Sequence, residues 1–290
     1  MRMMLLAIVW IAMAPWLYAQ VSVELSLNQE QYLPREPMLV KVRITNLSGQ
    51  TLEFGKEWDW LQFVVESRDG LPVVKQGEVP VQSEFSLETA QVAIKTVDLA
   101  PYYSLTIPGR YRVTATIRIS QWGQMIGSPP QDFDIVRGVK IWEQQFGMPM
   151  PPGATNRPPQ VRKFALIKVA YLKKLRLYFS LSNAPETEVY RVFPIGDVVS
   201  FSQPAALLDK ANNLNVLYQF GARSYYYLLV SPSGDLLSRQ TYDITDVRPV
   251  MRPDEDGVVK IVGGVRRPSF DDVPANDRSS SPTDVPATTP

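Results

Sequence analysis

Residues 21–54, VSVELSLNQEQYLPREPMLVKVRITNLSGQTLEF, decide the fold class of this chain. Apolar and polar side chains alternate in residues 21–27, and the alternation returns in residues 39–44. This period of two is typical of a β-strand that buries one face and exposes the other. The prolines between the two runs break the first strand, and TNLSGQ (45–50) favours a turn. The stretch therefore predicts antiparallel strands at the start of the chain.

The same pattern continues through residues 20–137. Short alternating runs are separated by turn signals such as SRDGLP. Further strands are expected at LQFVVES (61–67), QVAIKTVDL (91–99) and YRVTATIRIS (111–120). Short strands at regular spacing are typical of an antiparallel β-sandwich. We therefore expect residues 20–137 to form one sandwich domain.

Two runs in this region resemble a known kind of domain. YLPREPMLVKVRITNLSGQTLEF (32–54) resembles the opening strands of secreted bacterial immunoglobulin-like and macroglobulin-like domains, and PGRYRVTATIRI (108–119) resembles their closing strands. The resemblance implies an immunoglobulin-like sandwich, but it implies no chemistry, because such sandwiches serve many functions. Arg35 stands where the first turn of these domains usually has Gly, so we expect a different turn geometry there.

The first residues have the order of a secretory signal. In MRMMLLAIVWIAMAPWLYAQ, Arg2 precedes an apolar run from Met3 to Tyr18, and the small residue Ala19 follows. We expect residues 1–19 to be removed by cleavage after Ala19, which makes the mature chain secreted or periplasmic. An uncleaved N-terminal anchor and a buried core helix are the alternatives.

Composition excludes several chemistries. The 290 residues include no His and no Cys, so a Ser-His-Asp or Cys-His site is excluded, and the usual zinc ligands are missing. We expect no cofactor and no metal. Thirty Lys and Arg against 29 Asp and Glu give a net charge of +1, so no overall field favours nucleic acid. The length suits two domains.

The second half is also rich in expected strands. Residues 138–160 are predicted to be a Pro-rich connector, in which GVKIWEQQ (138–145) is either a short strand or a turn. Residues 161–265 form a second β-rich domain in this interpretation. Its first strands are expected at KFALIKVAYL (163–172), KLRLYFSLS (174–182), EVYRVFPI (188–195) and VVSF (198–201). Residues 266–290, rich in Pro, Ser, Thr and Asp, are predicted to be a disordered tail.

Three consecutive tyrosines mark a hairpin in the second domain. In an extended ARSYYYLLVSPSGDLLSRQTY (222–242), Tyr225 and Tyr227 face one side and Tyr226 faces the other, with the turn at PSGD. This unit weakly resembles a propeller-blade repeat, and RPDEDGVVKIVGG (252–264) echoes it. We expect a meander or partial-propeller-like domain, with a second small sandwich as the alternative.

Charged segments are interpreted as surface. The basic run over residues 157–193 is expected to be a solvated face, with an anionic glycan or membrane surface as an alternative and nucleic acid as the least favoured partner. DEDG (254–257) lacks the ligand spacing of a calcium loop and is expected to be a turn.

Two aromatic pairs are the candidate binding residues. In KEWDWLQF (56–63), Trp58 and Trp60 would share one face of a strand, which favours a core position, and a partner surface or a sugar platform is the alternative. Tyr225 and Tyr227 are the second pair.

Three functions remain open. The first is an exported, non-enzymatic binding or structural module whose partner is an unknown protein or glycan, with possible self-association through sheet edges. The second is a glycan hydrolase that needs only paired carboxylates. Its candidates are Glu57, Asp59, Asp209 and Asp254. The third is a proteinase inhibitor that presents the loop 69–82 or 146–160.

Overall fold

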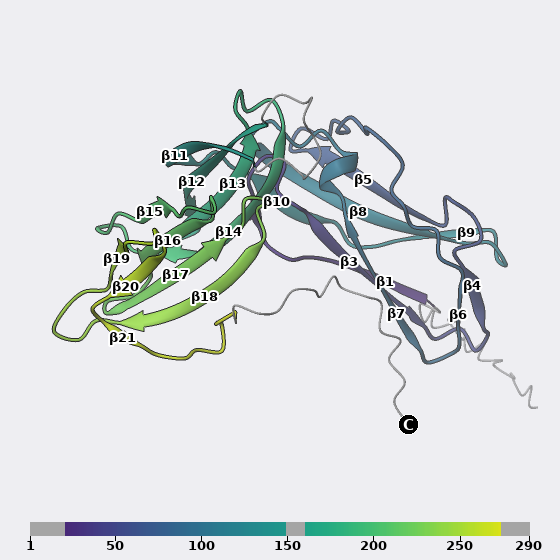
Figure 1. Ribbon diagram of the computed structural model, residues 1–290. Coiled ribbons are helices and arrows are strands. Elements are labelled where there is room, and N and C mark those ends of the chain that lie inside the picture. Colours follow the sequence, from purple (N-terminus) through teal and green to yellow (C-terminus); the bar gives the residue numbers. More distant parts are fainter. Residues whose placement is uncertain (1–20, 149–159, 274–290) are drawn as a thin grey trace, which may run out of the picture.

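The structure of the protein is a computed structural model that describes residues 21–148 and 160–273. In that part of the chain the regular structure is β-strand apart from one 3₁₀ turn, η1 (Ala100–Tyr102) (Figure 1). The expected all-β class is confirmed. No helix in these ranges is long and apolar enough to cross a membrane. The expected leader, residues 1–19, lies outside the described residues, as do the proline-rich part of the connector and the end of the tail.

The first domain contains two sheets that enclose one hydrophobic core. One sheet has the order β1-β3-β7 and the other β2-β10-β8-β5, with β9 pairing to β8. All neighbours are antiparallel except β2 and β10. A separate ribbon of β4 and β6 closes one end (Figure 1). The strands are β1 (Val21–Leu27), β2 (Gln31–Tyr32), β3 (Leu39–Asn46), β4 (Leu52–Phe54), β5 (Leu61–Ser67), β6 (Phe85–Leu87), β7 (Val92–Asp98), β8 (Gly109–Ile119), β9 (Gln124–Gly127) and β10 (Gln131–Ile135).

The alternation in the sequence becomes alternation across these sheets. In β1, Val21, Val23 and Leu25 are buried in the core, and the polar residues between them face outward. Strand β3 pairs with β1 so that Val42 lies opposite Leu25 and Ile44 opposite Val23. Apolar positions of both strands therefore share one face, as the period of two predicted.

The turn between β2 and β3 contains a residue with a left-handed backbone that is not glycine. Arg35 has a φ of +66°, in the left-handed region that L-residues rarely adopt. The Glu36 amide donates to the Leu33 carbonyl at 3.1 Å and closes the turn. Arg35 thus adopts the left-handed conformation that glycine adopts most readily.

The second domain consists of two antiparallel meanders packed face to face. One sheet has the order β11-β12-β13-β14, and the other β15-β16-β17-β18-β21. Phe164 and Phe179 of the first sheet share a core with Tyr218 and Leu228 of the second. The strands are β11 (Val139–Gly147), β12 (Val161–Tyr171), β13 (Lys174–Asn183), β14 (Val189–Val198), β15 (Ala205–Leu208), β16 (Leu214–Gln219), β17 (Ser224–Val230), β18 (Leu236–Asp243) and β21 (Val265–Arg266).

This packing is a sandwich arrangement rather than radial propeller blades. The expected meander order is present in both sheets, except that the last strand, β21, joins β18 after an intervening hairpin. The predicted hairpin between β17 and β18 is also present, with its turn closed by the Ser231 amide and the Asp235 carbonyl at 2.8 Å.

The expected connector begins later than the sequence indicated. Residues 139–147 form β11, a strand of 9 residues that pairs with β12. Of the two alternatives for GVKIWEQQ, the strand is therefore the observed one, and it belongs to the second domain. Its period of two was hidden because β11 is an edge strand that exposes most residues on both faces.

Part of the expected disordered tail is ordered against β18. Val273 and Arg239 exchange two backbone hydrogen bonds of 3.1 Å. The Asp272 carboxylate accepts a hydrogen bond from Thr241 and another from Arg266 at 2.7 Å. The rest of the expected tail, residues 274–290, lies outside the described residues.

Candidate functional site

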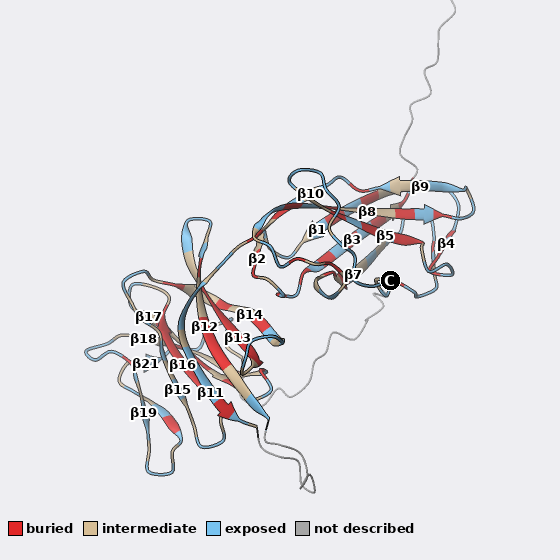
Figure 2. Cartoon of the chain, turned by 90° about the horizontal axis from the view of Figure 1, so that it is seen from above, coloured by how far each residue is buried: buried red, intermediate tan, exposed pale blue. Residues whose placement is uncertain are grey.

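The two domains meet where the turn after β2 contacts the first sheet of the second domain. Leu33 is buried against Val169, Tyr178 and Val192, which lie on β12, β13 and β14. Arg35 donates from its guanidinium to the Thr187 carbonyl at 3.1 Å. In Figure 2 the domains meet at the end of the first domain that carries β2. We call this contact the joint.

Gly138 lets the chain cross between the domains close to β12. A Cβ atom at Gly138 would lie 2.2 Å from a methyl carbon of Ile167 and 3.0 Å from one of Val169. Real Cβ atoms essentially never approach that closely, so a side chain here would require Ile167, its strand or the crossing segment to shift. The crossing segment therefore forms a wall directly above the face of β12.

A groove of about 290 Å³ opens beside this wall, and we call it the joint groove. Leu33 and Pro34 of the first domain line one side of it. The rest of the lining comes from the crossing segment and the second domain and consists of apolar residues, two serines and charged side chains. These residues are Arg137, Gly138, Lys140, Ala165, Ile167, Ser180, Ser182, Glu186, Val189 and Val192.

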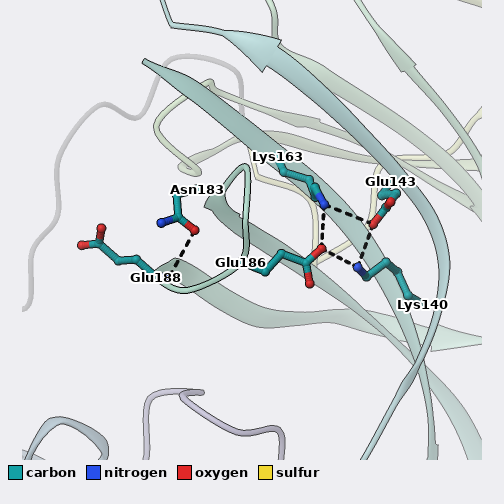
Figure 3. Close-up of polar contacts among 6 residues, drawn as sticks. All are labelled: Lys140, Glu143, Lys163, Asn183, Glu186 and Glu188. Atoms are coloured by element: carbon teal, nitrogen blue, oxygen red, sulfur yellow. Dashed lines mark hydrogen bonds and ion pairs between the residues drawn. The ribbon is translucent and has the colours of Figure 1, made fainter. Parts of the chain in front are cut away.

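Two lysines and two glutamates form an ion cluster (Figure 3), and two of its members, Lys140 and Glu186, line the groove. The Lys140 ammonium lies 2.7 Å from the Glu143 carboxylate and 2.6 Å from that of Glu186. The Lys163 ammonium lies 2.8 Å from Glu186 and 3.8 Å from Glu143. Hydrogen bonds from Lys140 and Lys163 lower the pKa of Glu186, and the bond from Lys140 lowers the pKa of Glu143. The cluster is neutral as a whole.

The hairpin loop that carries Glu186 has a constrained backbone. Glu186 has a φ of +60°, and its amide donates to the Asn183 carbonyl at 3.1 Å. The Asn183 side chain accepts a hydrogen bond from the Glu188 amide at 3.1 Å (Figure 3). A left-handed glutamate is costly by about 1 kcal/mol, and its position here allows both lysines to reach one carboxylate.

The ion cluster does not form a nucleophilic site. Lys163 lies directly across from Ser182 on neighbouring strands, which is the spacing that a Ser-Lys pair needs. The ammonium of Lys163, however, donates to Glu186 and is not free to accept a proton from Ser182. The groove therefore offers a surface for binding rather than a reactive hydroxyl.

Glu36 is a buried carboxyl group behind the joint. It is 3% exposed and accepts hydrogen bonds from the Leu33 amide at 2.7 Å and from the Gln29 side chain. Burial raises the pKa of Glu36 to about 7. A cavity of about 180 Å³ adjoins it, lined also by Tyr103 and Ser104. Glu36 was not among the candidate residues of the sequence analysis. The one feature of the sequence that could have drawn attention to it is its position in the turn segment PREP (34–37).

The tryptophans of KEWDWLQF do not share a face. They lie in a turn before β5, not in a strand. Trp58 is 62% exposed, whereas Trp60 is 2% exposed and donates from its indole nitrogen to the Val81 carbonyl at 2.9 Å. Trp60 is thus a core residue, and the pair does not make a continuous platform.

Tyr225 and Tyr227 lie on one face of β17 and Tyr226 on the other, as the extended geometry predicted. The first two are buried beneath the hairpin of β19 (Val250–Pro253) and β20 (Val259–Val262). Their hydroxyls donate to Gln219 at 3.1 Å and to Asn215 at 2.6 Å. Tyr225 alone of this pair also borders a cleft, between β15 and β19.

The candidate carboxylates are divided between the domains. Glu57 and Asp59 both face Arg118, at 3.6 and 2.7 Å. Asp209 and Asp254 lie in turns of the second domain. The Asp209 carboxylate accepts a hydrogen bond from the Asn213 amide, and the Asp254 carboxylate accepts one from the Val258 amide.

The described residues hold no group of three or more Asp or Glu side chains that could bind a metal ion. DEDG (254–257) forms a turn in which Gly257 donates to the Asp254 carbonyl, as expected.

Ion pairs neutralise much of the basic run. Lys174 and Arg176 both contact Asp197, and Arg191 contacts Asp235. The Arg176 guanidinium also lies 3.6 Å from the centre of the Tyr171 ring. Lys174 and Arg191 are exposed and Arg176 is partly exposed, so these residues form a charged sheet surface.

The loop 69–82 forms backbone hydrogen bonds with two neighbouring segments of the first domain. The Val73 amide donates to Val65 at 2.8 Å, and the Ser104 amide donates to Val74 at 3.0 Å. Of the second candidate loop, 146–160, residues 146 and 147 end β11, residues 148 and 160 are also described, and the rest lies outside the described residues.

Comparisons with known proteins do not assign a family. No protein-family model matches the chain, and no curated protein matches it. Among solved structures, the chain is similar to the crystal structure of Spo0M, a sporulation control protein from Bacillus subtilis. The two share 10% identity over 61% of this chain and 90% of that chain, with a TM-score of 0.31. A likeness at that score carries no argument, so the class rests on this chain alone: an all-β protein of several sheets.

Proposed function

We propose that this protein is an exported, non-enzymatic binding module that takes its partner in the joint groove. The observation that carries the proposal is the groove itself, because both domains contribute to it and its walls are held by the joint. Binding sites are commonly concave, largely apolar and located between domains. The signal-like sequence of residues 1–19 supports export, and the two sheets around one core in the first domain support the resemblance to secreted immunoglobulin-like modules.

Binding is favoured over catalysis by the chemistry of the site. The chain has no His and no Cys, and Lys163 is engaged by carboxylates. A glycan hydrolase needs two carboxylates roughly 5–10 Å apart on either side of a sugar. Glu57 and Asp59 instead converge on one arginine. These observations support the module and leave the hydrolase without a site that favours it.

The test is a paired screen of the mature chain. The protein is exposed to a displayed library of random 12-residue peptides and to a glycan array. Val189→Arg fills the groove with a long charged side chain at a position that is only half-buried. Val161→Arg is the matched control, because Val161 is 43% exposed on the same sheet and does not line the groove. We expect specific ligands that bind the control and not Val189→Arg. Ligands that bind both variants equally, or a complete absence of ligands, would overturn the proposal.

A further inference from the structure

The joint groove has one positive charge without a partner. Lys140 and Lys163 share the carboxylates of Glu143 and Glu186, so these four charges cancel. Arg137 also lines the groove and is exposed, and among the described residues it has no carboxylate within ion-pair distance. The neutralised glutamates leave the Arg137 guanidinium as the charge that a ligand meets. The groove therefore favours an anionic group at its rim.

The floor of the groove combines apolar surface with hydroxyls. Ile167 and Val192 supply aliphatic surface, and the buried serines Ser180 and Ser182 lie on the same face of β13. An acyl chain over this floor would offer the buried serine hydroxyls no hydrogen bond, which is costly. A peptide offers aliphatic side chains together with backbone donors and acceptors, and so matches both kinds of surface.

The lining argues against a sugar. None of the residues that line the joint groove is aromatic. Sugar recognition uses aromatic rings, because their faces pack against the apolar faces of the sugar. Trp58, the exposed indole, is in the turn before β5 and does not line the groove.

From these observations we infer that the joint groove binds an extended, acidic peptide segment of a partner protein. One aliphatic side chain of the peptide rests on Ile167 and Val192, and an Asp or Glu nearby in the peptide pairs with Arg137. Arginine pairs well with a carboxylate because its planar guanidinium donates two parallel hydrogen bonds. The inference rests on the proposed function and names the class of its ligand.

The size of the groove agrees with a short segment. Its volume of about 290 Å³ lies just below the range of ligand pockets, which is roughly 300–1,000 Å³. Such a site holds an anchor of a few residues, as in domains that recognise linear peptide motifs. A folded partner would contact the groove only through such a projecting segment.

The experiment is a comparison of peptide selections. The random 12-residue library is selected on the wild-type chain, on Arg137→Glu and on Arg68→Glu. Arg68 is the matched control, because it is exposed on the first domain and has no ion pair among the described residues. We expect the wild type and the control to enrich peptides in which Asp or Glu lies beside Val, Leu or Ile. We expect Arg137→Glu to enrich Lys or Arg instead.

Affinities give the second readout. A synthetic acidic peptide from the wild-type selection should bind Arg137→Glu about 10- to 100-fold more weakly by calorimetry, since a charge-assisted pair is lost and a repulsion is added. The Arg68→Glu variant should bind with unchanged affinity. Three results would overturn this inference: peptides enriched without a charge preference, the same preference for acidic peptides in Arg137→Glu, or binding of glycans alone. Each of these results would leave the proposed binding function intact. If Val189→Arg retains every ligand, or no ligand is found, the proposed function fails as well.

Discussion

At the scale of single residues, the turn after β2 concentrates the unusual features of the chain. Arg35 adopts a left-handed backbone, and the neighbouring Glu36 buries its carboxyl group. Leu33 in the same turn packs on the second domain. The left-handed backbone of Arg35 and the burial of Glu36 are each unfavourable alone, so favourable contacts such as the packing of Leu33 must compensate for them.

Glu36 makes stability depend on pH. Burial raises its pKa from 4.5 to about 7, so the native state binds the proton more tightly than the unfolded chain does. Its contribution is complete below pH 4.5 and is lost as pH rises through about 7. Glu36→Gln removes this titration. We expect the variant to gain stability relative to the wild type between about pH 5 and about pH 8, by on the order of 2 kcal/mol.

Urea unfolding at several pH values measures the effect of Glu36→Gln. The expected signature is a difference between the two proteins that grows with pH and then levels off above pH 7. Parallel stability curves across the whole range would show that Glu36 titrates normally.

The two tryptophans of the turn before β5 should respond differently to truncation. Trp60→Ala removes a fully buried side chain and leaves the Val81 carbonyl without its indole donor, at an expected cost of about 3–5 kcal/mol. Trp58→Ala removes an exposed side chain and should change stability by less than about 0.5 kcal/mol. Chemical unfolding of both variants checks this, and equal losses would contradict the core assignment of Trp60.

At the scale of strands, the pattern of apolar residues decided which strands could be predicted from the sequence. Five strands of the first domain, β1, β3, β5, β7 and β8, were predicted from the sequence, whereas the shorter β2, β4, β6, β9 and β10 were not. Strand β13 does not alternate: residues 177–182 are all buried, because one face lies in the core and the other lies under the joint. Strand β11 also lacks the alternation, but for the opposite reason: it is an edge strand whose residues are mostly exposed on both faces.

The crossing segment before β11 depends on one glycine. Gly138→Ala would place a Cβ atom 2.2 Å from Ile167, so β12 or the crossing segment must move. We expect a loss of roughly 1–3 kcal/mol, as is typical when a packed site is overfilled. Gly147→Ala, at the end of β11, meets nothing within 4 Å and serves as the control. Thermal unfolding distinguishes them, and a neutral Gly138→Ala would mean that the segment is not packed on β12.

At the scale of the whole molecule, the candidate site arises from contacts between distant parts of the chain. Leu33 and Val192 meet at the joint although the sequence separates them widely. Neither composition nor periodicity encodes such a meeting, so the joint groove was beyond sequence reasoning. The aromatic candidates illustrate the same point, because Trp60, Tyr225 and Tyr227 are conspicuous in the sequence and all three are buried. Their packing within each domain explains their presence without a ligand.

The most direct measurement is methyl NMR of the mature chain during titration with the selected acidic peptide. The account requires saturable shifts of the methyl groups of Leu33, Ile167 and Val192, with one common affinity. Methyl groups of Leu71 and Ile94, which are 66% and 65% exposed elsewhere on the first domain, should not move. Saturation with peptide that leaves the methyl groups of the joint groove unchanged, and shifts another surface instead, would contradict the account.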